Sequence, residues 1–164
     1  MKLHRKPIRL AIGALTGVGV FISSVVMIMA LRTDLAGGGG VIKSPGRHPS
    51  RSGAFSVLVS ISDCGIVKYE VTNVTTGRKL VSADAGSTYQ RWFFVWDDSD
   101  NLWVHSSDLG GTVWVRGTDG AFREESPFSP ERLKTMPPEY RAGLPRSLKR
   151  DLGDAYRKGD ITGF

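Results

Sequence analysis

The first pattern along the chain is an uncharged run near its start. Residues 10–31 carry no charged side chain, and most of their positions hold Leu, Ile, Val, Phe or Met. As an α-helix rising about 1.5 Å per residue, the run spans about 33 Å, close to the ~30 Å hydrocarbon core of a bilayer. A globular surface helix keeps a polar face, which this run lacks. The sequence therefore predicts a single transmembrane α-helix over residues 10–31.

The alternative for this run is a cleaved signal peptide. The apolar core of a signal peptide usually covers about 7–15 residues, fewer than are present here. Ile28-Met29-Ala30 is a passable cleavage site and Asp34-Leu35-Ala36 a poor one, and neither is Ala-x-Ala. The retained helix, a signal anchor contacting the lipid bilayer, is the favoured interpretation.

Charges flank the anchor on both sides. Residues 1–9 carry four Lys or Arg, whereas the four of residues 32–52 are spread over a longer segment. Since the denser basic cluster stays in the cytoplasm, we predict a cytoplasmic N-terminus, a single-pass location in the cell membrane and an extracytoplasmic domain. The opposite orientation leaves the domain in the cytoplasm. Gly13 and Gly17 form a small-xxx-small pair that favours a homodimer, unless their spacing is chance.

The segment 32–53 is rich in Gly and Pro and predicts a flexible linker. Its basic side chains either lie on anionic head groups or are solvated linker charges. These side chains are Lys43, Arg47, His48 and Arg51.

Residues 54–121 alternate between apolar and polar positions, the period of half-buried strands. Six short strands are predicted, at residues 55–61, 67–72, 79–82, 91–96, 102–105 and 112–116, with a turn at 84–87. The segment 91–96 is apolar on both faces, which predicts a strand covered on each side. The whole indicates a small mainly-β domain: an antiparallel meander, closed as a sandwich or a partly open barrel.

All four tryptophans fall between positions 92 and 114. If Trp96 faces Leu102 across the acidic turn, Val95 meets Trp103. The cluster either forms the core or presents an open aromatic face to a sugar or peptide. The candidates for such a face are Trp103 and Trp114, because their strands also carry polar residues.

Residues 122–164 form a Pro-rich segment and a C-terminal helical arm. Ser129 before Pro130 is typical of a helix start and predicts a short helix over 130–134. A longer helix is predicted over 146–158, with an apolar stripe that either covers the sheet or binds in a groove of a partner protein. The stripe consists of Leu144, Leu148, Leu152 and Tyr156.

The charge distribution argues against nucleic acid as a partner. The net charge is +6, yet residues 53–123 hold six Lys or Arg and eight Asp or Glu. A nucleic-acid-binding protein places its positive charge on the folded surface that contacts phosphate.

Few residues suggest chemistry. Cys64 is the only cysteine, and the acidic turn at 97–101 lacks the spacing of a calcium loop, so no metal or other cofactor is predicted. His105, followed by Ser106, Ser107 and Asp108, is the only histidine within the predicted domain.

Three functions remain open. The leading hypothesis is a non-catalytic binding module of the cell envelope that contacts a protein or polymer, with Trp103, Trp114 and His105 as ligand-binding candidates. The alternatives are a small membrane-tethered, hydrolase-like enzyme using His105 with a nearby Asp or Ser, and a structural subunit of a membrane complex.

We predict that the full-length product stays in the membrane pellet after washing with alkaline carbonate, because the bilayer solvates residues 10–31. A matched variant with Val18 and Val25 replaced by Lys should be released, since each central charge costs about 2.5–3.5 kcal/mol on insertion. Unprocessed parent protein that is monodisperse in the aqueous fraction without detergent would contradict the anchor.

Overall fold

The computed structural model describes residues 40–157. The predicted anchor at 10–31, with Gly13 and Gly17, lies outside the described residues. Among the helices of the described range, none has both the length and the apolar character needed to cross a bilayer.

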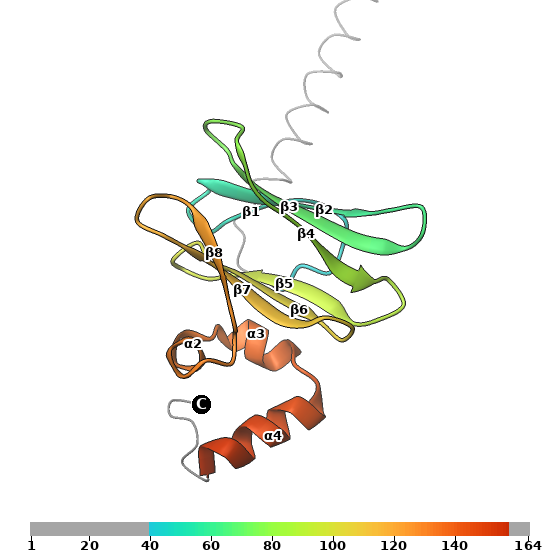
Figure 1. Ribbon diagram of the computed structural model, residues 1–164, viewed down its shortest axis with the longest axis vertical. Helices are drawn as coiled ribbons and strands as arrows, with labels where there is room; N and C mark the ends of the chain where they lie inside the picture. Colours follow the sequence, from blue (N-terminus) through green and yellow to red (C-terminus); the bar gives the residue numbers. More distant parts are fainter. Residues whose placement is uncertain (1–39, 158–164) are drawn as a thin grey trace, which may run out of the picture. The chain divides into compact units, whose positions relative to one another are not determined.

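Two four-stranded antiparallel sheets form the domain (Figure 1). The first is a meander of β1 (Gly46–Pro49), β2 (Phe55–Ile61), β3 (Ile66–Asn73) and β4 (Lys79–Ser87). The second is a meander of β5 (Trp92–Trp96), β6 (Leu102–Ser106), β7 (Gly110–Arg116) and β8 (Phe122–Glu125). The prediction of a small mainly-β domain is confirmed, and the sheets stack as a sandwich.

The hairpin of β5 and β6 has the predicted register. Trp96 lies opposite Leu102, and Val95 lies opposite Trp103. The turn between the strands closes through Asp100, whose φ of 60° places it in the left-handed region. Asp is one of the few side chains that tolerate this conformation, and Asp100 is held there by hydrogen bonds from the Ser52 backbone N–H and hydroxyl.

The second sheet is buried on both faces, as its apolar β5 predicted. One face packs against the first sheet and contributes Phe94, Trp96, Leu102 and Val104 to the inter-sheet core. The other face packs against the C-terminal helices and contributes Phe93, Val95, Trp103 and Val113 to a second core. Because side chains alternate along a strand, one hairpin supplies both cores.

Three helices follow the second sheet: α2 (Pro130–Thr135), α3 (Pro138–Gly143) and α4 (Arg146–Arg157). Helices α2 and α3 lie next to the outer face of this sheet, and α4 lies farther from it (Figure 1). Ser129 caps α2 as predicted, its hydroxyl accepting a hydrogen bond from the Arg132 backbone N–H at 3.3 Å. Leu144 and Leu152 are buried in the second core and Leu148 packs against it, so this arm covers the sheet.

Some elements differ from the sequence prediction. Strand β1 lies within the predicted linker. The sequence did not indicate it, because its four residues pair with β2 through the backbone and carry no apolar alternation. Strand β4 continues through residues 84–87, predicted as a turn, because Ala85 packs in the inter-sheet core. Strand β8 and helix α3 were not predicted, and both lie in the Pro-rich segment that begins at residue 122.

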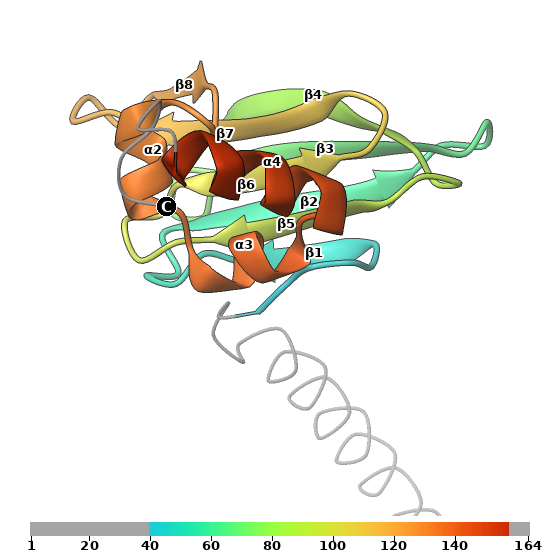
Figure 2. The same cartoon turned by 90° about the horizontal axis from the view of Figure 1, so that it is seen from below.

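The two sides of the sandwich differ. On one side, Ile42 exchanges two backbone hydrogen bonds with Phe94 of β5, after which the chain crosses to the first sheet as β1. The connecting residues therefore cover the side at which β1 and β5 are the edge strands. On the other side, the edge strands are β4 and β8 (Figure 2). No residue of the described chain pairs with the outer edge of either strand.

The Trp103→Ala variant should lose about 3–5 kcal/mol of unfolding free energy, because it empties a fully buried site. Urea titration of the full-length chain in mild detergent, followed by circular dichroism, measures this loss. Tyr89→Ala is the control, since Tyr89 is 94% exposed and its loss should change stability by less than about 0.5 kcal/mol. Equal stability of the two variants would show that Trp103 is not a core residue.

Candidate functional site

Trp103, one of the three candidate residues, is a core side chain. It is 0% exposed, and its ring centroid lies 5.3 Å from that of Tyr140 of α3. Its indole Nε1 donates a hydrogen bond to Asp97 Oδ2 at 2.9 Å. The ring therefore has no open face for a ligand in this conformation.

His105 is also buried, at 3% exposure, with its ring centroid 4.9 Å from that of Phe93. Within the described part of the chain, neither ring nitrogen has a hydrogen-bond partner. Burial, together with the charge of Arg91, lowers the pKa of His105 below its ordinary value, so the ring is neutral.

The hydroxyl next to His105 serves a different purpose. Ser106 Oγ accepts hydrogen bonds from the backbone N–H groups of Asp108 and Leu109, and so holds the turn after β6. Ser106 faces the space between the sheets, whereas His105 faces the helices, because neighbours on a strand alternate. The structure does not bring His105 together with a nucleophile and a carboxylate, which a hydrolytic triad requires.

Trp114 is the candidate that reaches a cavity. It is half-buried and lines a cleft of about 330 Å³ between the two sheets, which we call the Trp114 cleft. Its Nε1 donates a hydrogen bond to the Tyr69 hydroxyl of the first sheet at 2.9 Å. Burial raises the pKa of Tyr69 to about 12, with smaller contributions from Glu124 and Asp84, so the phenol stays neutral.

The remaining walls of the Trp114 cleft come from both sheets. Strand β4 provides residues 82–85, the β6–β7 turn provides Leu109, β7 provides Gly110, and β8 provides Glu124. The Thr112 hydroxyl donates to Glu124 Oε1 at 2.7 Å and fixes that carboxylate beside the cleft. Because β4 and β8 are edge strands, the cleft lies on the side of the sandwich opposite the bridge between Ile42 and Phe94.

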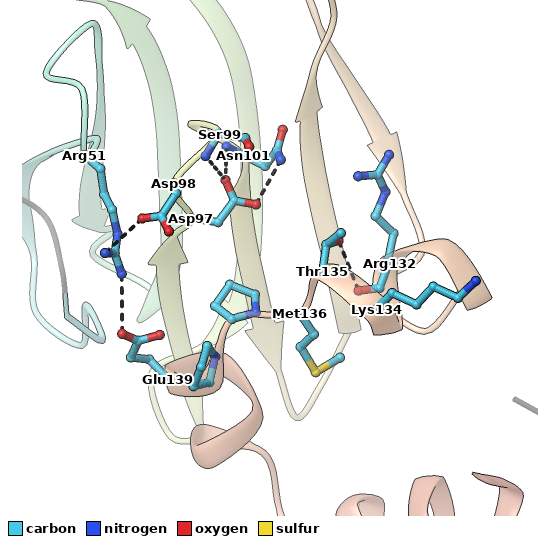
Figure 3. A pocket seen from close by; sticks show the side chains of 12 residues that line it. Arg51, Asp97, Asp98, Ser99, Asn101, Arg132, Lys134, Thr135, Met136 and Glu139 are labelled. Carbon is cyan, nitrogen blue, oxygen red and sulfur yellow. Dashed lines mark hydrogen bonds and ion pairs between the residues drawn. The ribbon is translucent and has the colours of Figure 1, made fainter. Parts of the chain in front are cut away.

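A second, larger cleft of about 550 Å³ lies between the β5–β6 turn and the α2–α3 connection (Figure 3). Its charged groups are largely engaged with one another. Arg51 pairs with Asp98 at 3.0 Å and with Glu139 at 3.4 Å. Asp97 accepts four hydrogen bonds, from Ser99 N, from Asn101 N and Nδ2, and from Trp103 Nε1. The acidic side chains of the β5–β6 turn in this cleft are therefore engaged, whereas Glu139 Oε2 is buried without a hydrogen-bond partner among the described residues.

The acidic turn in this second cleft is structural. Its carboxylates hold the hairpin and the β1–β2 turn, and nowhere in residues 40–157 do three His, Cys, Asp or Glu side chains converge in a group that could hold a metal. Two basic side chains expected in a linker also have protein partners: Arg51, and Arg47, which donates to Ser56 Oγ at 2.8 Å.

The chain matches no protein-family model, and no curated protein or solved structure is a match for it. Its function must therefore be inferred from the geometry of its own residues.

Sequence reasoning identified Trp114 but missed the carboxylate next to it. Glu124 stands in the segment assigned to the C-terminal arm. The signal available in the sequence was the alternation of Thr112 and Trp114 on one face of β7, which indicates a polar neighbour of the indole. Glu124 reaches that face because it pairs with Trp114 across β7 and β8. Asp84 stands between Ala83 and Ala85, which face the inter-sheet core, and so lies on the exposed outer face of the first sheet.

Lowering the pH from 7 toward 5 should reduce the unfolding free energy, in part because of His105. The unfolded chain binds a proton near the ordinary histidine pKa of about 6.5, whereas the folded state, with its lowered pKa, does not. His105→Leu should weaken this decline and raise stability at pH 7 by up to about 1–3 kcal/mol, since it removes unpaired buried nitrogens.

Urea titrations of the full-length chain at several pH values test the role of His105. His48→Gln is the control, because His48 bonds to the Ser44 backbone oxygen on the surface. A parent-like pH dependence in His105→Leu would show that His105 does not carry the effect.

Proposed function

We propose that the protein is a membrane-anchored, non-catalytic binding module whose extracytoplasmic β domain recognises a partner of the cell envelope through the Trp114 cleft. The observation that carries this proposal is a half-buried tryptophan, fixed by Tyr69, in a cleft whose polar groups are not all engaged by the protein itself. Aromatic side chains with one apolar face and one polar handle are enriched at binding surfaces.

Three observations favour binding over catalysis. His105 is buried, and its ring nitrogens have no hydrogen-bond partner among the described residues, so it is not placed to act as a general base in a solvent-accessible site. The second cleft uses its charged groups to join the β5–β6 turn to α3. The Trp114 cleft is lined by no cysteine or histidine. A fixed aromatic wall with polar groups at its rim is suited to recognition.

Within the described residues, the first segment of the chain lies on the side of the sandwich away from the Trp114 cleft. Ile42 pairs with β5, on the side of the sandwich opposite the edge strands β4 and β8 that border the cleft. The uncharged run at 10–31 and the basic residues before it support a single-pass location with the domain outside the cytoplasm. A structural subunit of a membrane complex would use the same surface, and identification of the partner separates the two roles.

Site-specific photo-crosslinking in the source cells tests the proposal. A benzoylphenylalanine replaces Leu109, which is 66% exposed and lines the cleft, or, as the matched control, Val74, which is 54% exposed and lies in the β3–β4 turn. We expect the probe at Leu109 to form an adduct with an envelope component that the probe at Val74 does not form. Mass spectrometry identifies the component.

Two second-site variants connect this adduct to the cleft. Trp114→Ala removes the aromatic wall, and Glu124→Tyr adds a ring at an exposed position directly across from Trp114 without removing a core group. Both should reduce the Leu109 adduct at least tenfold. The proposal fails if the Leu109 adduct is no stronger than the Val74 adduct, or if a folded Glu124→Tyr variant forms it at the parental level.

A further inference from the structure

The unpaired edge of β4 borders the Trp114 cleft. Strand β4 contributes Ala83 and Ala85 to the walls of the cleft, and it is the outermost strand of the first sheet. It approaches β6 of the second sheet. Since β7 follows β6 in that sheet, one further strand beside β4 would lie over β7, which carries Trp114. The cleft therefore lies where a fifth strand of the first sheet would lie.

Backbone groups of β4 are directed toward this position. In an antiparallel pair, residues alternate between bonding to the partner strand and directing their N–H and C=O groups away from it. The backbone bond from Ser62 N–H to Ile66 O fixes this alternation in the β2–β3 hairpin. Carried through the β3–β4 register, it directs the N–H and C=O groups of Ser82 and Asp84 away from β3. Within residues 40–157 no strand pairs with this edge, so both residues can bond to an added strand.

The other three edges of the two sheets are protected against a further strand. In β1, Pro49 stands at a position whose backbone nitrogen points outward, and proline has no N–H to donate. In β8, which has four residues, Glu124 places a charge on the face toward the first sheet. Ile42 covers the edge of β5. In β4, by contrast, residues 80–83 include neither a proline nor a charged side chain.

The bridge between Ile42 and β5 shows which chemistry a sheet edge of this sandwich accepts. Ile42 exchanges two backbone hydrogen bonds with Phe94, at 2.8 and 3.0 Å, and its side chain is buried between the sheets. One extended residue thus pairs with the edge through its backbone and fills the inter-sheet space with an aliphatic side chain. A residue opposite Ala83 would point the same way, toward the walls formed by Val104 and Trp114.

We propose that the β4 edge binds an extended segment of a partner polypeptide, which adds to the first sheet as an antiparallel strand. Its backbone pairs with Ser82 and Asp84, and the residue between these two pairs, opposite Ala83, inserts an aliphatic side chain into the Trp114 cleft. This inference rests on the proposed function and gives the chemistry of the partner. The backbone bonds supply affinity for any extended segment, and the inserted side chain supplies specificity.

The first test uses the full-length protein in nanodiscs, with 5-fluorotryptophan at its four tryptophan positions. The resonance of Trp114 is assigned by its loss in Trp114→Phe. The probe is the peptide acetyl-Thr-Thr-Ile-Thr-Thr-amide, which should shift this resonance saturably, with a dissociation constant on the order of 1–10 mM. Replacing its isoleucine by serine removes the aliphatic side chain and should weaken binding at least tenfold.

Two N-methylated forms of the probe test the backbone pairing. Methyl groups on the two threonines beside the isoleucine block the N–H groups that donate to Ser82 and Asp84, and should weaken binding at least tenfold. In the control, the methyl groups are on the isoleucine and on the last threonine, whose N–H groups point away from β4, so this form should bind as the unmodified probe does. Strand addition is overturned if the two forms bind equally, or if the unmodified probe gives no saturable shift.

A proline variant applies the same test to the protein. Ser82→Pro removes an outward N–H without removing a bond to β3, and should weaken the probe at least tenfold. Arg47→Pro is the control, because Arg47 directs its N–H outward at the β1 edge, and it should bind as the parent does. Urea titration establishes that each variant is folded. Parental binding by a folded Ser82→Pro variant would contradict the proposal, and the N-methylated probes decide it where that variant does not fold.

Further outcomes separate strand addition from the proposed function. A Leu109 adduct that depends on Trp114 but persists in a folded Ser82→Pro variant would overturn strand addition and leave the binding module intact. A dimer of the chain that Ser82→Pro dissociates, measured by sedimentation in detergent, would assign the edge to a second copy and overturn the partner segment. Loss of the adduct in Ser82→Pro, with no loss in Arg47→Pro, supports both proposals.

Discussion

The structure depends on burial of the second sheet on both of its faces. Trp96 and Trp103 lie on neighbouring strands of one hairpin and point to opposite cores, so neither the first sheet nor the helices can be removed without exposing an indole. Burying an aromatic side chain also requires a partner for its polar handle. Trp96 Nε1 finds the His48 backbone oxygen at 3.3 Å, and Trp103 Nε1 finds Asp97. These bonds connect each core to the turns and edge strands around it.

The same constraint explains why a cleft arises near Trp114. Strands β5 and β6 are short and largely apolar and are covered on both faces. Strand β7 has Thr112 and Trp114 on the face toward the first sheet, next to the edge strand β8. On the far side of the sandwich, the bridge between Ile42 and Phe94 covers the edge of β5. No described segment does this for β4 and β8, so their polar side chains and the indole remain accessible. The open side is a consequence of how the chain enters the fold.

Much of this architecture could be predicted from the sequence, because it depends on local patterns. The run at 91–96 indicated a strand covered on both faces, the acidic turn set the hairpin register, and Ser129-Pro130 set the start of α2. Local patterns could not predict β1, since Gly-Arg-His-Pro pairs through its backbone alone. They also gave Trp103 and Trp114 the same status, because polar neighbours in sequence do not reveal that helices cover one face of the sheet and not the other.

A single small cleft binds weakly by itself, and the proposed membrane anchor would compensate for this. An aromatic contact adds about 0.5–1.5 kcal/mol beyond the area that it buries. Confining both partners to one membrane raises their effective concentration toward the millimolar range, where such a site is substantially occupied. A pair of chains associated through Gly13 and Gly17 would present two clefts and add avidity without any new contact. A single polar cleft on a small tethered domain is then sufficient for recognition, and the residues that would tighten it are not needed.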